Sequence, residues 1–79
     1  MKRSRGQIVL AILDLLAAQD RLKTEIVYQA NLNFRTIDRY LEKLVEAGNV
    51  AWNERNRRWY LTTAGREAID HLREVEAIL

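Results

Sequence analysis

The sequence contains no cysteine and no proline, and it has a single histidine and three glycines among its 79 residues. Without cysteine the chain can form no disulfide, no thiolate metal site and no cysteine nucleophile. His71 alone cannot build an imidazole metal site. A chain this short buries one small core and leaves little room for an enclosed substrate cavity. These absences exclude most enzymes and favour a small binding module.

No group of residues has the pattern of a catalytic site. The acidic residues Asp14, Asp20, Asp38 and Glu42 fall on separate predicted elements, and Ser4, the only serine, lies close to the chain start. No nucleophile is therefore predicted beside a general base. We expect neither enzyme activity nor a metal or cofactor, and no small-molecule ligand is evident.

Long apolar runs are also missing, since no stretch approaches the roughly 18 to 20 apolar residues that span a bilayer. The basic start followed by apolar residues 8–18 resembles a secretion signal, but Asp14 interrupts this stretch. The charged segment 19–21 also stands where a small-residue cleavage site would be. We expect a folded protein with no membrane partner, cytoplasmic and associated with the nucleoid.

Basic residues only slightly outnumber acidic ones, but the two kinds are unevenly distributed along the chain. Lysine and arginine number 13 against 11 acidic residues, a net charge of +2. Residues 1–23 carry five cations and two anions, and residues 53–58 carry three cations and one anion. Residues 62–79 carry two cations and four anions. A polyanionic partner is therefore expected at the first two segments and not at the last.

Hydrophobic periodicity and capping residues predict four helices and one β-hairpin. The predicted helices cover residues 7–19, 25–30, 34–47 and 63–79, and the hairpin strands cover residues 50–52 and 59–62. Thr24, Asn33 and Thr62 are expected to cap the helices that follow them. Asn31 is expected to take a left-handed backbone after the second helix, and Asn56 a positive φ at the hairpin tip.

A helix, a short helix, a tight turn, a longer helix and a hairpin follow each other in the order of a winged helix-turn-helix. The predicted fold class is thus mainly α with a small β-hairpin: three helices plus a wing and a C-terminal fourth helix. We expect a basic N-terminal arm at 1–6, a DNA-binding domain at 7–62 and a dimerisation helix at 63–79. The hairpin is expected to pack Val50, Leu61 and at least one tryptophan on the helices, because two strands alone are marginal.

Three segments carry a family resemblance. They are residues 23–33 with an Ala-Asn-Leu-Asn turn, residues 40–48 with a Tyr-Leu-x-x-Leu core, and residues 59–65 with a Tyr-Leu-Thr-x-x-Gly entry to the last helix. The sequence resembles archaeal winged-helix DNA-binding proteins, which include small chromatin-like proteins that dimerise through a C-terminal antiparallel coiled coil. The last helix is shorter here than in those relatives. The resemblance implies that residues 34–47 form the recognition helix.

The polar face of that helix is the one that the resemblance places against bases. A helix about 10 Å across fits a major groove about 12 Å wide. Arg35 and Arg39 lie one turn apart, and each can hold a guanine edge or a phosphate through its planar guanidinium. The predicted DNA-binding residues are Asn33, Arg35, Thr36, Arg39 and Lys43 on the helix, Arg55, Arg57 and Arg58 on the wing, and Arg3 and Arg5 in the arm.

A competing interpretation is that the basic side chains of this helix form ion pairs on a solvated face. The acidic residues available on the same helix are Asp38, Glu42 and Glu46, and the last two also repel phosphate. Trp52 and Trp59 are expected to pack within the hairpin and not to act as base-stacking platforms.

An apolar stripe at coiled-coil spacing runs along the last predicted helix, and the first helix has a surplus apolar face. The predicted dimer interface comprises Val9, Leu13, Ala68, Leu72, Val75 and Leu79. The alternative is that the stripe only packs on the first helix of the same chain.

The sequence therefore predicts a homodimeric protein that binds double-stranded DNA, a transcriptional regulator. It reads the major groove with helix 34–47 and contacts the backbone or minor groove with the basic wing 53–58. The alternative is a winged-helix protein-protein interaction module in a transcription-related assembly. A docking module requires no basic wing or arm, and this difference favours DNA.

Overall fold

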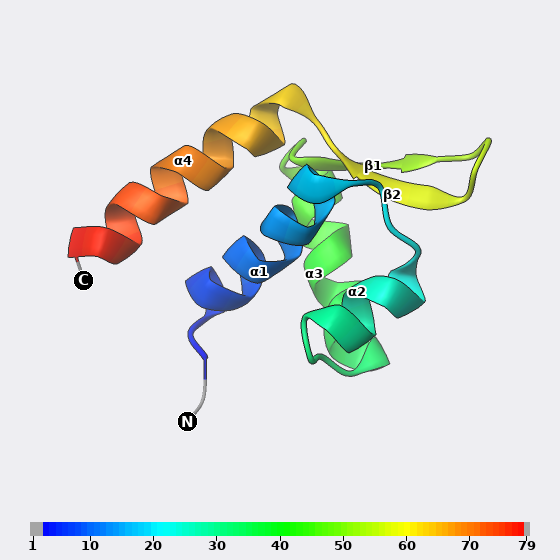
Figure 1. The fold of residues 1–79 in the computed structure, drawn as a ribbon, viewed down its shortest axis with the longest axis horizontal. Helices are drawn as coiled ribbons and strands as arrows, with labels where there is room; N and C mark the ends of the chain where they lie inside the picture. The colour runs from blue at the N-terminus through cyan, green and yellow to red at the C-terminus, as the bar shows by residue number, and fades with distance from the viewer. Residues whose placement is uncertain (1–2, 79) are drawn as a thin grey trace.

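The computed structural model describes residues 3–78, which form four helices and one two-stranded antiparallel sheet (Figure 1). The elements in chain order are α1 (Arg5–Ala18), α2 (Lys23–Gln29), α3 (Phe34–Glu46), β1 (Val50–Asn53), β2 (Arg58–Leu61) and α4 (Thr63–Ile78). The predicted order of elements is confirmed. Within residues 3–78 no helix has the length and apolar character to cross a membrane.

Helix α1 begins two residues earlier than predicted, because Ser4 caps it. The hydroxyl of Ser4 accepts from the Gln7 backbone N–H at 3.1 Å, and the Gln7 side chain accepts from the Ser4 backbone N–H at 2.8 Å. This reciprocal capping box satisfies two donors of the first turn. Arg5 and Gly6, which were expected in the basic arm, are therefore helical.

Helix α2 also begins earlier than predicted, and Thr24 does not cap it, so that prediction is wrong. The Glu25 carboxylate, in the first turn, accepts from the backbone N–H of Leu22 at 2.7 Å. Because Glu25 reaches back in this way, the helix starts at Lys23 without a side-chain cap from the preceding residue. Thr24 is an exposed residue of the first turn.

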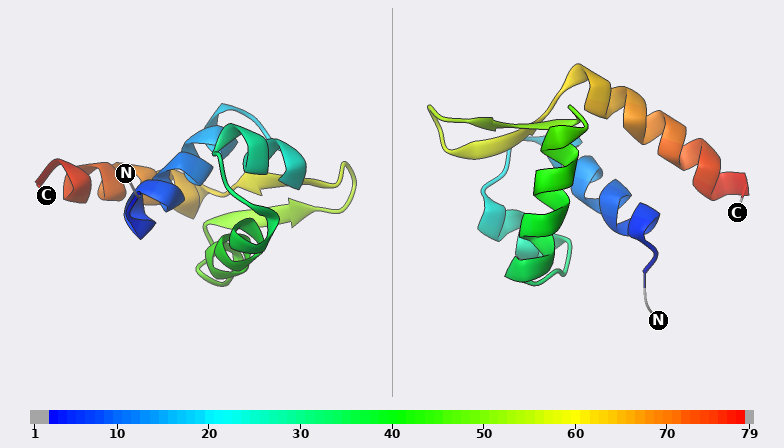
Figure 2. Two further views of the ribbon diagram at one scale, coloured as in Figure 1. Left: turned by 90° about the horizontal axis from the view of Figure 1, so that it is seen from below. Right: turned by 180° about the vertical axis from the view of Figure 1, so that it is seen from behind.

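The turn between α2 and α3 follows the prediction. Asn31 has a φ of 56°, and a short polar side chain tolerates this left-handed backbone better than most. Asn33 caps α3, because its side-chain oxygen accepts from the Thr36 backbone N–H at 2.7 Å. The short turn at 30–33 sends α3 across α2 at a steep angle (Figure 2).

The hairpin tip differs from the prediction in which residue takes the positive φ. Arg57 has the φ of 57°, so the prediction for Asn56 is wrong. The Asn56 side chain instead accepts from the Arg58 backbone N–H at 3.1 Å. This hydrogen bond to the backbone two residues on is the local turn that asparagine side chains commonly form.

The hairpin is paired at its base and is held again near its tip. Val50 pairs with Leu61 across the two strands. Trp59 also exchanges two backbone hydrogen bonds with Arg21, in the loop between α1 and α2, at 3.0 and 2.8 Å. A single bridging residue produces no alternating pattern, so the sequence could not indicate this third partner.

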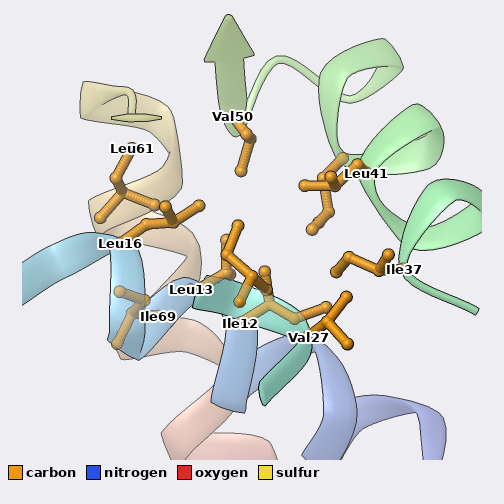
Figure 3. Packing of buried hydrophobic residues seen from close by; sticks show 11 residues of the cluster. Ile12, Leu13, Leu16, Val27, Ile37, Leu41, Val50, Leu61 and Ile69 are labelled. Atoms are coloured by element: carbon orange, nitrogen blue, oxygen red, sulfur yellow. The ribbon is translucent and has the colours of Figure 1, made fainter. Parts of the chain in front are cut away.

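One hydrophobic cluster unites all four helices and both strands (Figure 3). Its members are Ile12, Leu13, Leu16, Ile26, Val27, Ile37, Leu41, Leu44, Val50, Leu61 and Ile69. The predicted packing of Val50 and Leu61 is confirmed. Trp59 packs against the cluster, whereas Trp52 is 37% exposed. Leu13 is 0% exposed, so it offers no surface to a second copy, and its prediction as a dimer-interface residue is wrong.

Helix α4 returns antiparallel along α1, on the side of α1 away from α2 (Figures 1 and 2). As predicted, Thr62 caps it, since its hydroxyl oxygen accepts from the Gly65 N–H at 3.0 Å. The same hydroxyl donates to the Gly48 carbonyl at 2.6 Å. Gly65 lies against the carbonyl of Asn49 so closely that a Cβ would collide with it. The start of α4 is thus fixed at the end of the α3–β1 connection.

Candidate nucleic-acid interface

Helix α3 presents one basic face to solvent. Its opposite face is fixed in the core by Ile37, Leu41 and Leu44. Arg35, Arg39 and Lys43 are exposed, and Thr36 is half-buried at the helix start. Packing therefore turns three cations outward along about two turns of one helix.

These three cations have no ion pair among residues 3–78. Asp38, which follows Arg35 by three residues on α3, instead binds Lys23 of α2, with 2.9 Å between Nζ and Oδ1. The alternative interpretation was that the acidic residues of α3 form ion pairs with its own basic side chains. Residues 3–78 contain no such pair. The positive charge of the face stays available to an external anion.

The N-terminus of α3 adds hydrogen-bond donors to this face. Asn33 uses its side-chain oxygen for the cap, which leaves its amide NH₂ group to donate elsewhere. The backbone N–H of Thr36 is taken by the cap, so Thr36 can contribute its hydroxyl. The positive end of the helix dipole also favours an anion at this point.

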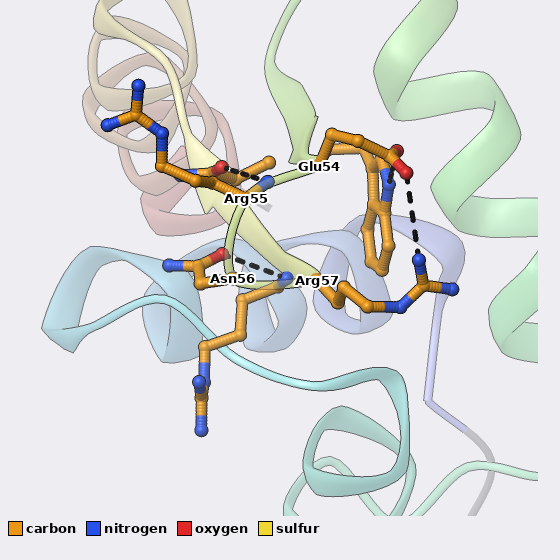
Figure 4. Close-up of polar contacts among 7 residues, drawn as sticks. Glu54, Arg55, Asn56 and Arg57 are labelled. Carbon is orange, nitrogen blue, oxygen red and sulfur yellow. Dashed lines mark hydrogen bonds and ion pairs between the residues drawn. The ribbon is translucent and has the colours of Figure 1, made fainter.

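The wing carries three arginines that differ in their surroundings (Figure 4). The Arg57 guanidinium lies 3.6 Å from the Glu54 carboxylate and 5.7 Å from the centre of the Trp52 ring. Trp52 donates its indole N–H to Glu54 at 2.9 Å, which holds that carboxylate in place. The Arg55 side chain points away from this group.

Arg55 and Arg58 form no ion pair within the described part of the chain. Arg55 is exposed and Arg58 half-buried. They are the wing cations whose charge is least compensated, whereas Arg57 is partly neutralised. The sequence could not show which of the three arginines is paired, because this depends on the direction in which each side chain leaves the hairpin tip.

The two described arginines of the arm lie near the helix-turn-helix. Arg3 donates to the backbone carbonyl of Asn31 in the α2–α3 turn at 3.0 Å. Arg5, in the first turn of α1, lines a hollow together with Arg39 and Lys43 of α3. Folding thus brings Arg5 to two of the predicted DNA-binding residues, more than 30 positions away in the sequence.

Other cations of the first 23 residues have structural roles that the sequence did not indicate. Arg21 donates its Nε–H to the carbonyl of Leu15 at 3.1 Å and so closes the C-terminal end of α1. Lys23 links α2 to α3 through Asp38. No sequence signal identifies that contact, since it depends on how the two helices cross. Lys2, also predicted for the arm, lies outside the described residues.

The residues predicted for a dimer interface are divided by the fold. Ala68 and Leu72 are half-buried against the core of the same chain, and Val9 is half-buried in the hollow beside Arg5. Val75 is 38% exposed and Ile78, one turn further along α4, is 84% exposed. Leu79 lies outside the described residues. The first half of the α4 stripe is internal, and its second half is open.

Comparison with known proteins gives a consistent family and fold. The family model described as winged helix-turn-helix matches residues 2–79. An uncharacterized protein of Methanocaldococcus jannaschii is 30% identical over 78 residues, which are 99% of this chain and 78% of that protein.

Two solved structures share the fold. Sso10a-2, a DNA-binding protein from Sulfolobus solfataricus, superposes with a TM-score of 0.84 at 26% identity, over 96% of this chain and 81% of that one. A MarR-family transcriptional regulator from Silicibacter pomeroyi superposes with a TM-score of 0.72 at 32% identity, over 82% of this chain. The match spans 47% of the regulator, about half of its length.

Proposed function

Because the chain belongs to the winged helix-turn-helix family, we propose that it binds double-stranded DNA as a transcriptional regulator. The observation that carries this proposal is the exposed face of α3, where Arg35, Arg39 and Lys43 are free of ion pairs within residues 3–78. A polyanion is the partner that best compensates such a face. The DNA-binding neighbour and the regulator that share this fold support the same conclusion.

In this proposal α3 enters the major groove and its arginines read base edges. Arg35 and Arg39 are separated by one turn, so that their guanidinium groups can reach successive base pairs. Asn33, Thr36 and Lys43 hydrogen-bond phosphates at the edges of the groove. Glu46 is the last residue of α3, three positions after Lys43, and so lies at the opposite end of the helix from Asn33 and Arg35.

The wing contacts the backbone or the adjacent minor groove. Arg55 and Arg58 supply the phosphate contacts, and Arg57 joins them when it exchanges Glu54 for a phosphate. An exposed ion pair contributes less than about 1 kcal/mol, so this exchange costs little. Arg3 adds a cation at the α2–α3 turn, and Arg5 adds one beside Arg39 and Lys43 of α3.

We further propose that the chain acts as a homodimer through α4, with residues 63–79 as the dimerisation helix and residues 7–62 as the DNA-binding domain. Val75 and Ile78 continue the stripe of Ala68 and Leu72 beyond the part that the chain itself covers. Two copies related by a two-fold axis can read half-sites about one helical turn apart.

The second candidate function is a protein-docking module, and one observation favours it. Tyr28 on α2 is 78% exposed, and Phe34 at the start of α3 is 46% exposed. Exposed aromatic residues are typical anchors of protein interfaces.

Salt dependence of duplex binding separates the two functions. Fluorescence anisotropy with a mixed-sequence duplex, at several salt concentrations, is the measurement. Four to six phosphate contacts give a slope of log affinity against log salt of about −0.9 per contact. Absence of any binding at micromolar protein in low salt would contradict the DNA proposal and leave the docking module.

A further inference from the structure

A hollow of about 250 Å³ lies between the start of α1 and the middle of α3. Its lining residues are Arg5, Val9, Arg39, Tyr40, Lys43 and Leu44. Small-molecule sites usually span about 300 to 1,000 Å³, and this hollow lies just below that range, so only a small ligand fits it. Sequence patterns do not indicate it, because its two walls come from segments about 30 residues apart.

The rim of the hollow is cationic. Arg5, Arg39 and Lys43 line it, no acidic side chain of residues 3–78 does, and none of the three cations has an ion pair in that range. Two guanidinium groups can each hold a carboxylate through two parallel hydrogen bonds, and the ammonium group adds a third cationic donor. The rim therefore matches one compact anionic group.

The floor of the hollow is apolar, and this distinguishes it from a plain phosphate contact. Of the lining residues, Val9 and Tyr40 are half-buried and Leu44 is buried, whereas the three cations are exposed. Tyr40 adds an aromatic ring. A phosphate of the DNA backbone gains nothing from such a floor. An organic acid gains about 25 cal/mol for each Å² of apolar surface that it removes from water.

We propose that this hollow binds a small carboxylic acid with an apolar, aromatic body, and that the bound acid competes with DNA. The competition rests on the proposed function, since it requires that Arg39 and Lys43 hold DNA. One side chain cannot hold both partners at once. Ligand at ten times its dissociation constant then weakens DNA binding about tenfold.

Binding of the acid is tested without DNA. The probe is 1-naphthoate, titrated into the full chain and followed by amide NMR shifts of Val9, Tyr40 and Leu44. Two matched ligands separate the parts of the site: naphthalene-1-methanol has the body without the charge, and sulfate has charge without the body. We expect the shifts to saturate with naphthoate. We also expect naphthoate to bind at least about tenfold more tightly than either matched ligand.

Exposed variants locate the site. Arg5→Gln and Lys43→Gln should each weaken naphthoate binding about tenfold, because each removes a charged hydrogen-bond donor. Arg66→Gln removes an exposed cation of α4 that does not line the hollow, and it should leave naphthoate binding unchanged. An equal loss in all three variants would mean unspecific attraction and would overturn the site. Equal binding of the neutral alcohol or of sulfate would overturn it as well.

A duplex-binding assay on the unmodified chain, with and without naphthoate, distinguishes the two proposals. Duplex binding without naphthoate binding overturns the hollow and leaves the DNA function intact. Naphthoate binding without duplex binding supports the site and overturns the DNA function. Simultaneous binding of both, with unchanged duplex affinity, overturns the competition.

Discussion

Asp38 and Arg39 are neighbours on α3, yet only Asp38 is held by an ion pair, to Lys23 of α2. The pair is exposed and contributes less than about 1 kcal/mol to stability. Its larger consequence is local: Asp38 lies three residues after Arg35, the spacing at which helix side chains can pair, and its carboxylate is bound by another helix instead. Within the described residues, the arginine is left without an internal anion.

Replacing Arg35 or Arg39 with alanine should change the preference among DNA sequences. A bidentate contact to a base edge contributes about 1 to 3 kcal/mol of discrimination, so affinity for the best site should fall by that amount. The measurement compares anisotropy curves for the best duplex from a random selection and for its single-base variants. Arg66→Ala is the control. A uniform loss across all duplexes would mean that base reading belongs to another element.

Gly65 is a second residue with a specific requirement, because a Cβ there would collide with the Asn49 carbonyl. Gly65→Ala should lower the free energy of unfolding by about 1 to 3 kcal/mol, since backbone has to move. At about 4 to 8 °C per kcal/mol for a chain of this size, thermal unfolding followed by circular dichroism resolves the change.

Gly6→Ala is the matched control for that substitution. Its Cβ would meet only the end of the Glu76 side chain, at 2.6 Å, which can swing away. Alanine is also favoured over glycine within a helix by up to about 1 kcal/mol. A midpoint for Gly65→Ala as high as for Gly6→Ala would show that the start of α4 is not closely packed.

At the scale of the elements, the sequence predicted the four helices and the hairpin but not all of their ends. Periodicity and Gly48 locate α3, because an amphipathic helix of this length is a strong local signal. The starts of α1 and α2 were missed because Gln7 and Glu25 reach back to residues before them. Such a contact competes with other candidate caps, and only the folded chain shows which one forms.

The candidate site was predictable in part, for a similar reason. Residues on one helix face are known once the helix is known, so Arg35, Arg39 and Lys43 could be grouped from spacing alone. Which charges pair across elements depends on helix crossing and on side-chain rotation. The pairing of Asp38 with Lys23, and of Glu54 with Arg57, was therefore beyond the sequence.

The wing gives a prediction at the element scale. Replacing Arg55 and Arg58 together with glutamine should weaken binding to all duplexes about equally. The salt slope should flatten by about 0.9 for each phosphate that the variant no longer neutralises. Anisotropy over a range of salt concentrations measures both. Arg57→Gln should have a smaller effect, because Glu54 already offsets part of that charge; a larger effect would reverse these roles.

At the scale of the whole molecule, α4 is half covered. Gly65 and Ile69 are buried in the shared core, whereas Ile78 is 84% exposed. An apolar end of a helix left in water favours association, and antiparallel association through α4 would cover it. A long coiled coil is not required, since only the last turns are uncovered.

Replacing Val75 and Ile78 together with serine should yield a monomer that keeps its fold, because neither residue belongs to the buried cluster. Sedimentation at tens of micromolar should give a mass near twice 9.3 kDa for the unmodified chain and near 9.3 kDa for the variant. Glu67→Ser, on the same helix and exposed, is the control. An unmodified chain that sediments near 9.3 kDa would exclude the dimer at this concentration.

The backbone bridge between Arg21 and Trp59 has a consequence for the proposed binding to DNA. If the two strands paired only with each other, the wing would sample many orientations relative to the helices. Binding would then have to select one of them, at a cost in conformational entropy. Here the wing is tied near its tip to the loop after α1, so that entropy is lost during folding and not at the encounter. The surface proposed to bind DNA is therefore preorganised, and binding should require little change in the conformation of the wing.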